Sequence, residues 1–149
     1  CTESLVSLNK LAAETARDFE IHAATDVTGF GLAGHALEMA GGSHVLFELS
    51  FADIPFFPGA LAMCERGIST RSNLTNRETA ISSLEFSQSL STFEEELMFD
   101  PQTNGGLLFA LPQGQVNAFV DRLRDAGITA SRQIGTAADY AQGPHLVIV

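Results

Sequence analysis

One acid and three glycines stand close together in the stretch ATDVTGFGLAGH, residues 24–35. Asp26 precedes Gly29, Gly31 and Gly34, and the spacing of the glycines matches the fingerprint that binds dinucleotide phosphates. A carboxylate beside a helix N-terminus would also suit a Mg²⁺–phosphate complex, because Mg²⁺ prefers oxygen ligands and backbone N–H groups bind phosphate. A third interpretation is structural: the glycines allow a tight strand-to-helix turn, and Asp26 caps that turn.

The dinucleotide interpretation has one further residue in its favour and two features against it. Glu48 follows Gly29 by about the 20 residues at which such sites place a ribose-binding acid. However, Asp26 and Thr28 are polar where a Rossmann strand is normally apolar, and no further βαβ units follow. From these residues alone, the structural interpretation and phosphate chemistry, which relies on positioning and charge neutralisation, both stay open.

A second glycine-rich stretch, FDPQTNGG, occupies residues 99–106. Asp100-Pro101 is typical of a turn, and Gly105-Gly106 permits close backbone approach before an apolar strand. Taken alone the stretch predicts only a turn. If both glycine turns lie side by side at one edge of a sheet, they could form one site.

Composition sets limits on the class of protein. The 149 residues are 45% hydrophobic, which is enough for the core of one ordinary domain. We expect no membrane anchor or signal peptide, because no apolar run approaches the roughly 20 residues that a span needs. The 18 acidic and 8 basic residues give a formal charge of −10, which argues against a nucleic-acid partner.

The cysteines and histidines give no metal-site spacing. Cys1 and Cys64 form neither a metal motif nor a disulfide framework, which favours a reducing, cytoplasmic location. The chain opens on Cys1 without a methionine, so we expect a piece of a longer protein, and we expect Cys64 to be buried filler. His22 and His35 could form a metal pair, but zinc needs closer-set clusters and further ligands.

Hydrophobic periodicity predicts an α/β (α+β) domain with helices packed on a mixed sheet of about four or five strands. Capping boxes are expected at Thr75–Glu78 and Thr92–Glu95, Thr28 is expected to be the N-cap of the second helix, and Gly41-Gly42 is expected to end it. The 67–78 stretch is expected to be a loop or an ordered excursion. The predicted helices cover residues 3–18, 28–40, 59–66, 77–84, 93–98 and 116–123, and the predicted strands cover 21–27, 45–51, 107–111, 128–136 and 146–149.

Two long stretches, ATDVTGFGLAGH and MFDPQTNGGLLFALP (residues 98–112), closely resemble the carboxy-terminal half of selenophosphate synthetase, also called selenide, water dikinase. The resemblance covers most of the chain and extends to Ile134-Gly135 before the last strands. It implies an enzyme that uses ATP, selenide and water to make selenophosphate, AMP and orthophosphate. It also implies the two-domain architecture of the aminoimidazole ribonucleotide synthetase superfamily, in which an amino-terminal domain dimerises and carries most of the ATP site.

The resemblance assigns roles by position. Asp26 matches the carboxylate that completes the Mg²⁺ cluster on the ATP phosphates, with the other acids in the amino-terminal domain. Thr28, Gly29 and Gly31 match the residues that shape this motif. The residues that would line the nucleotide cleft are Gln102, Thr103, Gly105 and Gly106. Residues 1–149 are thus expected to be a single domain that closes over an ATP site and needs the amino-terminal domain as its partner.

Some positions depart from the family pattern. Asn104 stands where the family usually has serine, and residues 69–73 keep Thr70 and Asn73 of a Gly-Gly-Thr motif but lose its glycines. The family's catalytic Cys or selenocysteine and its Lys lie in the amino-terminal portion, so we expect no catalytic residue in this chain and no ATP turnover by it alone. The alternatives are a sister ATP-using enzyme of the superfamily and a standalone non-catalytic binding module. The coding sequence upstream of Cys1 would distinguish them.

Overall fold

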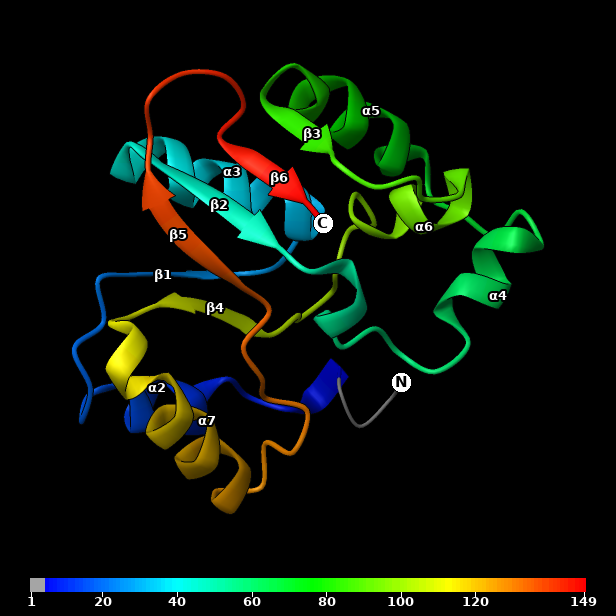
Figure 1. The fold of residues 1–149 in the computed structure, drawn as a ribbon. Coiled ribbons are helices and arrows are strands. Elements are labelled where there is room, and N and C mark those ends of the chain that lie inside the picture. The colour runs from blue at the N-terminus through cyan, green and yellow to red at the C-terminus, as the bar shows by residue number, and fades with distance from the viewer. Residues whose placement is uncertain (1–4) are drawn as a thin grey trace.

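The computed structural model describes residues 5–149, and these residues form two sheets with helices packed around them (Figure 1). The predicted α/β class with a mixed sheet is confirmed. The helices are α2 (Lys10–Ala16), α3 (Gly31–Ser43), α4 (Ala60–Glu65), α5 (Arg71–Ala80), α6 (Thr92–Leu97) and α7 (Val116–Asp125). The strands are β1 (Ala23–Asp26), β2 (Val45–Leu49), β3 (Leu84–Phe86), β4 (Leu107–Ala110), β5 (Gly135–Asp139) and β6 (Leu146–Ile148).

The larger sheet has the strand order β3-β6-β2-β5 and mixed directions. Strand β6 runs parallel to both β2 and β3, whereas β5 runs antiparallel to β2. Helix α3 covers one face of this sheet, so the fully buried Ala33, Ala36 and Ala40 meet Leu146 and Ile148 in the main core. Small side chains on α3 let the helix lie close to the sheet.

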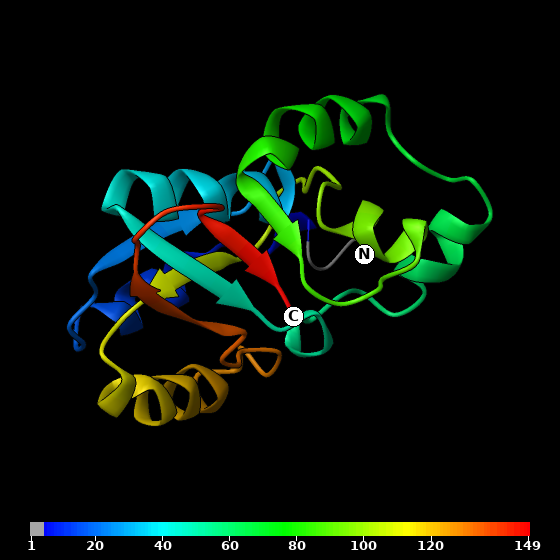
Figure 2. The same ribbon diagram turned by 45° about the horizontal axis from the view of Figure 1, so that its top comes forward.

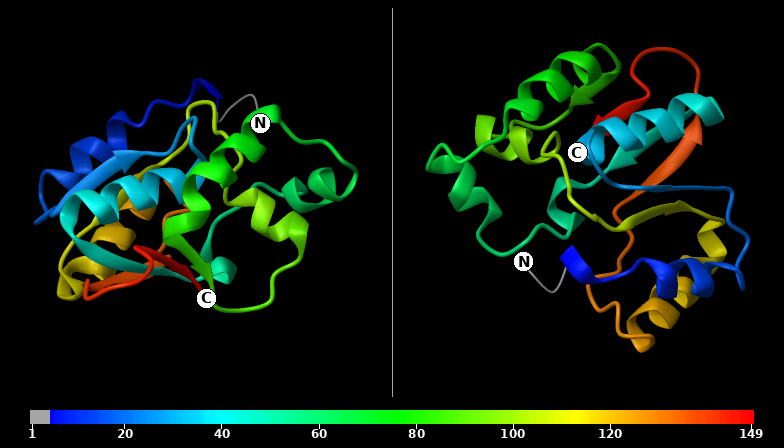
Figure 3. Two further views of the ribbon diagram at one scale, coloured as in Figure 1. Left: turned by 90° about the horizontal axis from the view of Figure 1, so that it is seen from above. Right: turned by 180° about the vertical axis from the view of Figure 1, so that it is seen from behind.

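The smaller sheet is the antiparallel pair β1–β4, which lies between the larger sheet and the helices α2 and α7 (Figures 1 and 3). Strand side chains alternate between faces. Leu108 and Ala110 accordingly pack against the main core, and Leu107 and Phe109 pack against a second cluster around Phe119. The prediction that this apolar run is covered on both faces is therefore confirmed.

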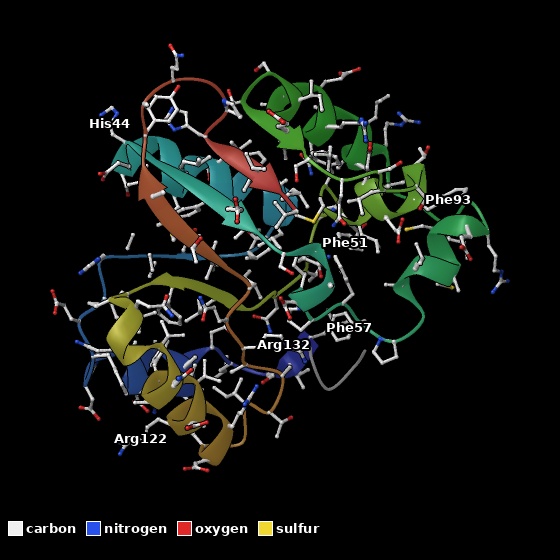
Figure 4. The ribbon with its side chains drawn as sticks, viewed as in Figure 1. His44, Phe51, Phe57, Phe93, Arg122 and Arg132 are labelled. Carbon is white, nitrogen blue, oxygen red and sulfur yellow. The ribbon has the colours of Figure 1, made fainter. Side chains whose placement is uncertain are left out.

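Helices α4, α5 and α6 form a lobe to one side of the sheets (Figure 2). Phe57 and Phe93 lie exposed on this side, whereas His44 lies at the far end of α3 (Figure 4). His44 takes a left-handed backbone with φ of 53° and ends the helix. The prediction that Gly41-Gly42 ends α3 is thus wrong, because the helix continues to Ser43.

Other boundaries also differ from the predictions. The first helix is shorter than expected: α2 begins at Lys10, and residues 3 and 4 of the predicted span lie outside the described residues. The Asn104 amide Nδ2 donates to the carbonyl oxygens of Leu5 and Ser7, and Asn9 Nδ2 donates to Gly105 O. The segment before α2 is thus held against the second glycine motif by side-chain hydrogen bonds.

Helix α5 begins at Arg71, inside the stretch predicted to be a loop, and Thr75 lies within the helix rather than at a cap. The capping box before α6 is real but one residue earlier than predicted, at Ser91 and Glu94. Strand β3 was not predicted, and β5 begins at Gly135 where a strand over 128–136 was expected. Short strands at a sheet edge carry too few side chains for a clear alternation.

Candidate functional site at the paired glycine motifs

The structure brings the two glycine motifs together. Asp26, the last residue of β1, pairs with Leu107, the first residue of β4. Beyond the strands the contact continues, since Val27 N donates to Gly106 O at 2.9 Å and Gln102 N donates to Thr28 O at 2.9 Å. Backbone hydrogen bonds therefore fix the turn that follows Asp26 against the turn that contains Gln102.

The Asp26 side chain is exposed at the end of its strand. No hydrogen bond or ion pair joins its carboxylate to another group among residues 5–149, and the Thr25 hydroxyl bonds only to the Asp26 backbone oxygen. The carboxylate is consequently not a cap of the turn, and both of its oxygens are available to a ligand.

Thr28 does not cap α3, contrary to the prediction, because Phe30 is the residue before the helix. The Thr28 carbonyl instead accepts hydrogen bonds from the amides of Gly31, at 3.1 Å, and Gln102. The Thr28 hydroxyl lies 3.2 Å from Nε2 of His35. Nδ1 of His35 lies 3.2 Å from a carboxylate oxygen of Glu38, and because a carboxylate oxygen accepts, Nδ1 is the donor in this contact.

Gly29 and Gly31 have different structural requirements. Gly31 has a φ of +68°, and a Cβ there would lie 2.7 Å from the Phe99 carbonyl carbon and 2.9 Å from Met98 O. Gly29 has neither restriction, because no atom lies within 4 Å of a Cβ at this position. The amides of Gly29 and Phe30 form no backbone hydrogen bond within the described part of the chain, so they are free donors ahead of α3.

In the second motif, Gly105 allows the close approach that the sequence predicted. A Cβ at this position would lie 2.1 Å from Val27 O, whereas Gly106 has open space around it. The Gln102 side chain folds back on Asp100, with Nε2 2.9 Å from Oδ2. Thr103 is exposed at the surface of the turn.

The geometry excludes a Rossmann-type dinucleotide site. Strand β1 pairs antiparallel with β4, whereas the strand after α3, β2, belongs to the other sheet. A Rossmann unit needs both strands parallel in one sheet around the connecting helix. Glu48 accordingly does not face the glycine turn but lines a separate pocket of about 240 Å³ with Ser50 and Asp53.

The histidines and the cysteine have other surroundings. His22 is exposed and lies 3.3 Å from Glu20, so it has a different partner from the buried His35. Among residues 5–149 no group of three or more His, Cys, Asp or Glu side chains is arranged to hold a metal ion. Cys64 is buried, as predicted, and burial raises the pKa of its thiol above the ordinary value of 9.0, with the Glu96 and Asp100 carboxylates adding to this effect.

The sequence did not point to the polar face of α5. Asn73 and Asn76 are buried there, one turn apart, in a helix whose other buried residue is Ala80. Asn76 also lines a groove of about 370 Å³ between α3 and α5, together with Phe30, Leu37 and His145. The sequence did contain a signal for this face, because Asn73 and Asn76 are three residues apart and so lie on the same side of a helix. The signal was missed because this stretch was predicted to be a loop.

Comparison with known proteins gives the family. The family model "AIR synthase related protein, C-terminal domain" matches residues 3–143, which is nearly the whole chain. The chain belongs to this family.

No helix in residues 5–149 is both long and apolar enough to cross a membrane.

Among curated relatives of this AIR synthase related domain is selenide, water dikinase 2 of Peptoclostridium acidaminophilum, which is 35% identical over 144 residues. The alignment covers 97% of this chain and 41% of that protein. The selenide, water dikinase of Rhizobium meliloti is 37% identical over 142 residues, covering 93% of this chain and 41% of that protein. The predicted resemblance is confirmed, and the chain spans about two fifths of the length of these relatives.

A solved structure, the hydrogenase maturation protein HypE, has a similar fold. The TM-score is 0.56 at 18% identity, over 93% of this chain and 36% of that one. At this identity the similarity concerns the fold alone.

Proposed function

We propose that this AIR synthase related domain is the ATP-site-closing domain of a selenophosphate synthetase, which makes selenophosphate, AMP and orthophosphate from ATP, selenide and water. The observation that carries the proposal is the pairing of the Asp26 turn with the Gln102 turn, in a chain 35% identical to a selenide, water dikinase. Residues 1–149 are then one domain of a longer two-domain enzyme. Its partner is an amino-terminal domain that supplies the nucleophilic Cys or selenocysteine.

The surroundings of Asp26 fit a shared Mg²⁺ site. Mg²⁺ is commonly held by one or two carboxylates together with substrate phosphates rather than by a cage of protein ligands. An exposed carboxylate with both oxygens available, and no further acid grouped with it in the described residues, meets that description. When bound, Mg²⁺ would neutralise negative charge on the ATP phosphates.

Each of the other site residues has a distinct role in the proposal. The free amides of Gly29 and Phe30 would donate to a phosphate oxygen near the N-terminus of α3. Gly31 shapes the turn, Thr28 joins it to the second motif, and Gln102 with its neighbours Thr103, Gly105 and Gly106 lines the cleft. No residue of this chain attacks a phosphorus atom, so the isolated domain should not turn over ATP.

The remaining parts of the proposal concern the whole enzyme. We propose that it is a homodimer, that it acts in the cytoplasm, and that neither nucleic acid nor a membrane is its partner. A surface with a formal charge of −10 would repel the phosphates of a nucleic acid.

The test is phosphorus NMR of the full-length protein with Mg²⁺, ATP and selenide in the absence of oxygen. Selenophosphate, AMP and orthophosphate in equal amounts are the expected products. Consumption of ATP only with a different acceptor would replace the proposal with a sister enzyme. An absence of both ATP binding and turnover would favour a non-catalytic binding module.

A further inference from the structure

Asn76 lies at the contact between the two glycine motifs, although it belongs to neither. It is 9% exposed and stands in α5, a helix whose other buried residues are Asn73 and Ala80. A buried amide is costly unless its polar atoms are hydrogen-bonded. The bonds that Asn76 forms therefore explain why a polar residue occupies this position.

Both of these bonds use the amide nitrogen. Nδ2 of Asn76 donates to Gly29 O at 2.9 Å and to Phe99 O at 2.9 Å. Because both partners are carbonyl oxygens, only the nitrogen end of the amide can face them, and this fixes the side-chain orientation. One amide thus joins α5 to two other segments, since Gly29 lies 47 residues and Phe99 lies 23 residues from Asn76 in the sequence.

The two carbonyls lie on the two turns of the candidate site. Gly29 stands between Asp26 and the start of α3, and Phe99 directly precedes Asp100 and the Gln102 turn. The backbone bond from Gln102 N to Thr28 O joins the same turns from the other side. Without the Asn76 amide, the β1–β4 pairing and the backbone bonds from Gln102 N to Thr28 O, Val27 N to Gly106 O and Ala33 N to Met98 O would have to hold the turns in register.

The position of Asn76 is itself supported by its neighbours. Arg77 forms an ion pair of 2.5 Å with Glu95 and lies 5.4 Å from the centre of the Phe99 ring. Asn73 Nδ2 donates to Glu96 at 3.1 Å. These contacts hold α5 against α6, so the Asn76 amide is presented to the turns by a fixed helix.

We propose that Asn76 is a positioning residue of the ATP site, which holds the Asp26 turn and the Gln102 turn at the separation that Mg²⁺-ATP requires. The inference rests on the proposed function of this domain. Asn76 touches neither substrate nor metal in this account, and its effect on the reaction comes through the Gly29 and Phe99 carbonyls.

The test uses the full-length protein and three variants at this position. Asn76→Asp keeps the size but removes both donors, Asn76→Ala removes the whole amide, and Asn76→Ser keeps one donor. A misplacement of about 1 Å in a site can cost on the order of 100-fold in rate. We therefore expect kcat/KM for ATP to fall about 10- to 100-fold in Asn76→Asp and Asn76→Ala, and less in Asn76→Ser.

Two control variants separate positioning from stability. Thr79→Ala removes a hydroxyl of α5 that, within residues 5–149, bonds only to the Thr75 carbonyl in the same helix. Leu84→Ala destabilises the main core from strand β3, outside both turns. Urea unfolding gives the free energy of unfolding of each variant, and thermal unfolding identifies a temperature at which all of them are folded for the kinetic comparison.

A second measurement does not depend on activity. Amide hydrogen exchange should become faster in residues 27–32 and 99–104 of the Asn76 variants, but not in Thr79→Ala or Leu84→Ala. If exchange and kcat/KM in Asn76→Asp match those of Leu84→Ala at equal stability, the positioning role is wrong. If the wild-type protein forms no selenophosphate, the proposed function fails, and the exchange measurement still decides whether Asn76 holds the two turns.

Discussion

Replacement of Gly31 by alanine should be among the most damaging small changes in the chain. The residue has a φ of +68°, and a left-handed conformation costs an L-residue about 1–2 kcal/mol. The added Cβ would also lie 2.7 Å from a backbone carbon of Phe99, which cannot move without shifting the second motif. Overpacking of this kind typically costs about 1–3 kcal/mol.

The two terms together predict that Gly31→Ala lowers the free energy of unfolding by about 2–5 kcal/mol. For a chain of this size that corresponds to a fall in Tm of roughly 4–20 °C. Urea unfolding followed by circular dichroism measures the change directly, provided that the slope of the transition is the same in both proteins.

Two matched glycine variants make the experiment specific. Gly41→Ala lies in the same helix with open space around the new methyl group, so it should stabilise the protein by about 0.5–1 kcal/mol. Gly29→Ala also meets no atom within 4 Å and should change stability by less than about 0.5 kcal/mol. Equal unfolding free energies for Gly31→Ala and wild type would refute the claim that only glycine fits between the two motifs.

Three further predictions concern other elements. Hydrogen bonds from the Ser91 backbone and side chain lower the pKa of Glu94 below its ordinary 4.5. The contribution of this carboxylate to stability is therefore present above pH 4.5 and is lost as the pH falls through the lowered pKa. Urea midpoints at several pH values should show this loss in wild type but not in Glu94→Gln. Cys64 is buried, and burial raises the pKa of its thiol. Iodoacetamide should therefore modify the Cys64 peptide slowly in native protein and rapidly in urea, as measured by mass spectrometry. Equal rates of modification would contradict the burial of Cys64. Gly135→Ala should lower the free energy of unfolding by about 1–3 kcal/mol, because its Cβ would lie 2.1 Å from a carbonyl oxygen of β2. Gly114→Ala is the control: its Cβ meets no atom within 4 Å, so it should not lower the free energy of unfolding in this way.

The sequence predicted those parts of the fold in which apolar residues carry the pattern. The apolar run at residues 107–111 gave β4, and the stripe that includes Phe119 and Leu123 gave α7. Helix α5 was mistaken for a loop over most of its length because its buried face consists largely of Asn73 and Asn76 rather than aliphatic side chains. A polar face becomes buried only when another segment supplies hydrogen-bond partners, and hydrophobic periodicity does not register this.

The candidate site was predictable in outline but not in its connections. The glycine spacing indicated two tight turns, and the close approach at Gly105 and the left-handed backbone at Gly31 follow that expectation. The sequence could not show that Thr28 would bond to His35 instead of capping α3, because the helix starts two residues later than the capping pattern indicated. Metal binding by Asp26 stays a prediction.

The most direct test of the central claim compares two aspartate variants of the full-length protein. Asp26→Asn removes the exposed carboxylate at the end of β1, and Asp139→Asn removes an exposed carboxylate at the end of β5 in the other sheet. Phosphorus NMR would follow selenophosphate formation across a range of Mg²⁺ concentrations. We expect Asp139→Asn to behave as wild type, and Asp26→Asn to lose product formation or to need far more Mg²⁺ for it. If Asp26→Asn forms selenophosphate at the wild-type rate with the wild-type Mg²⁺ requirement, Asp26 is not a ligand of the metal–ATP complex.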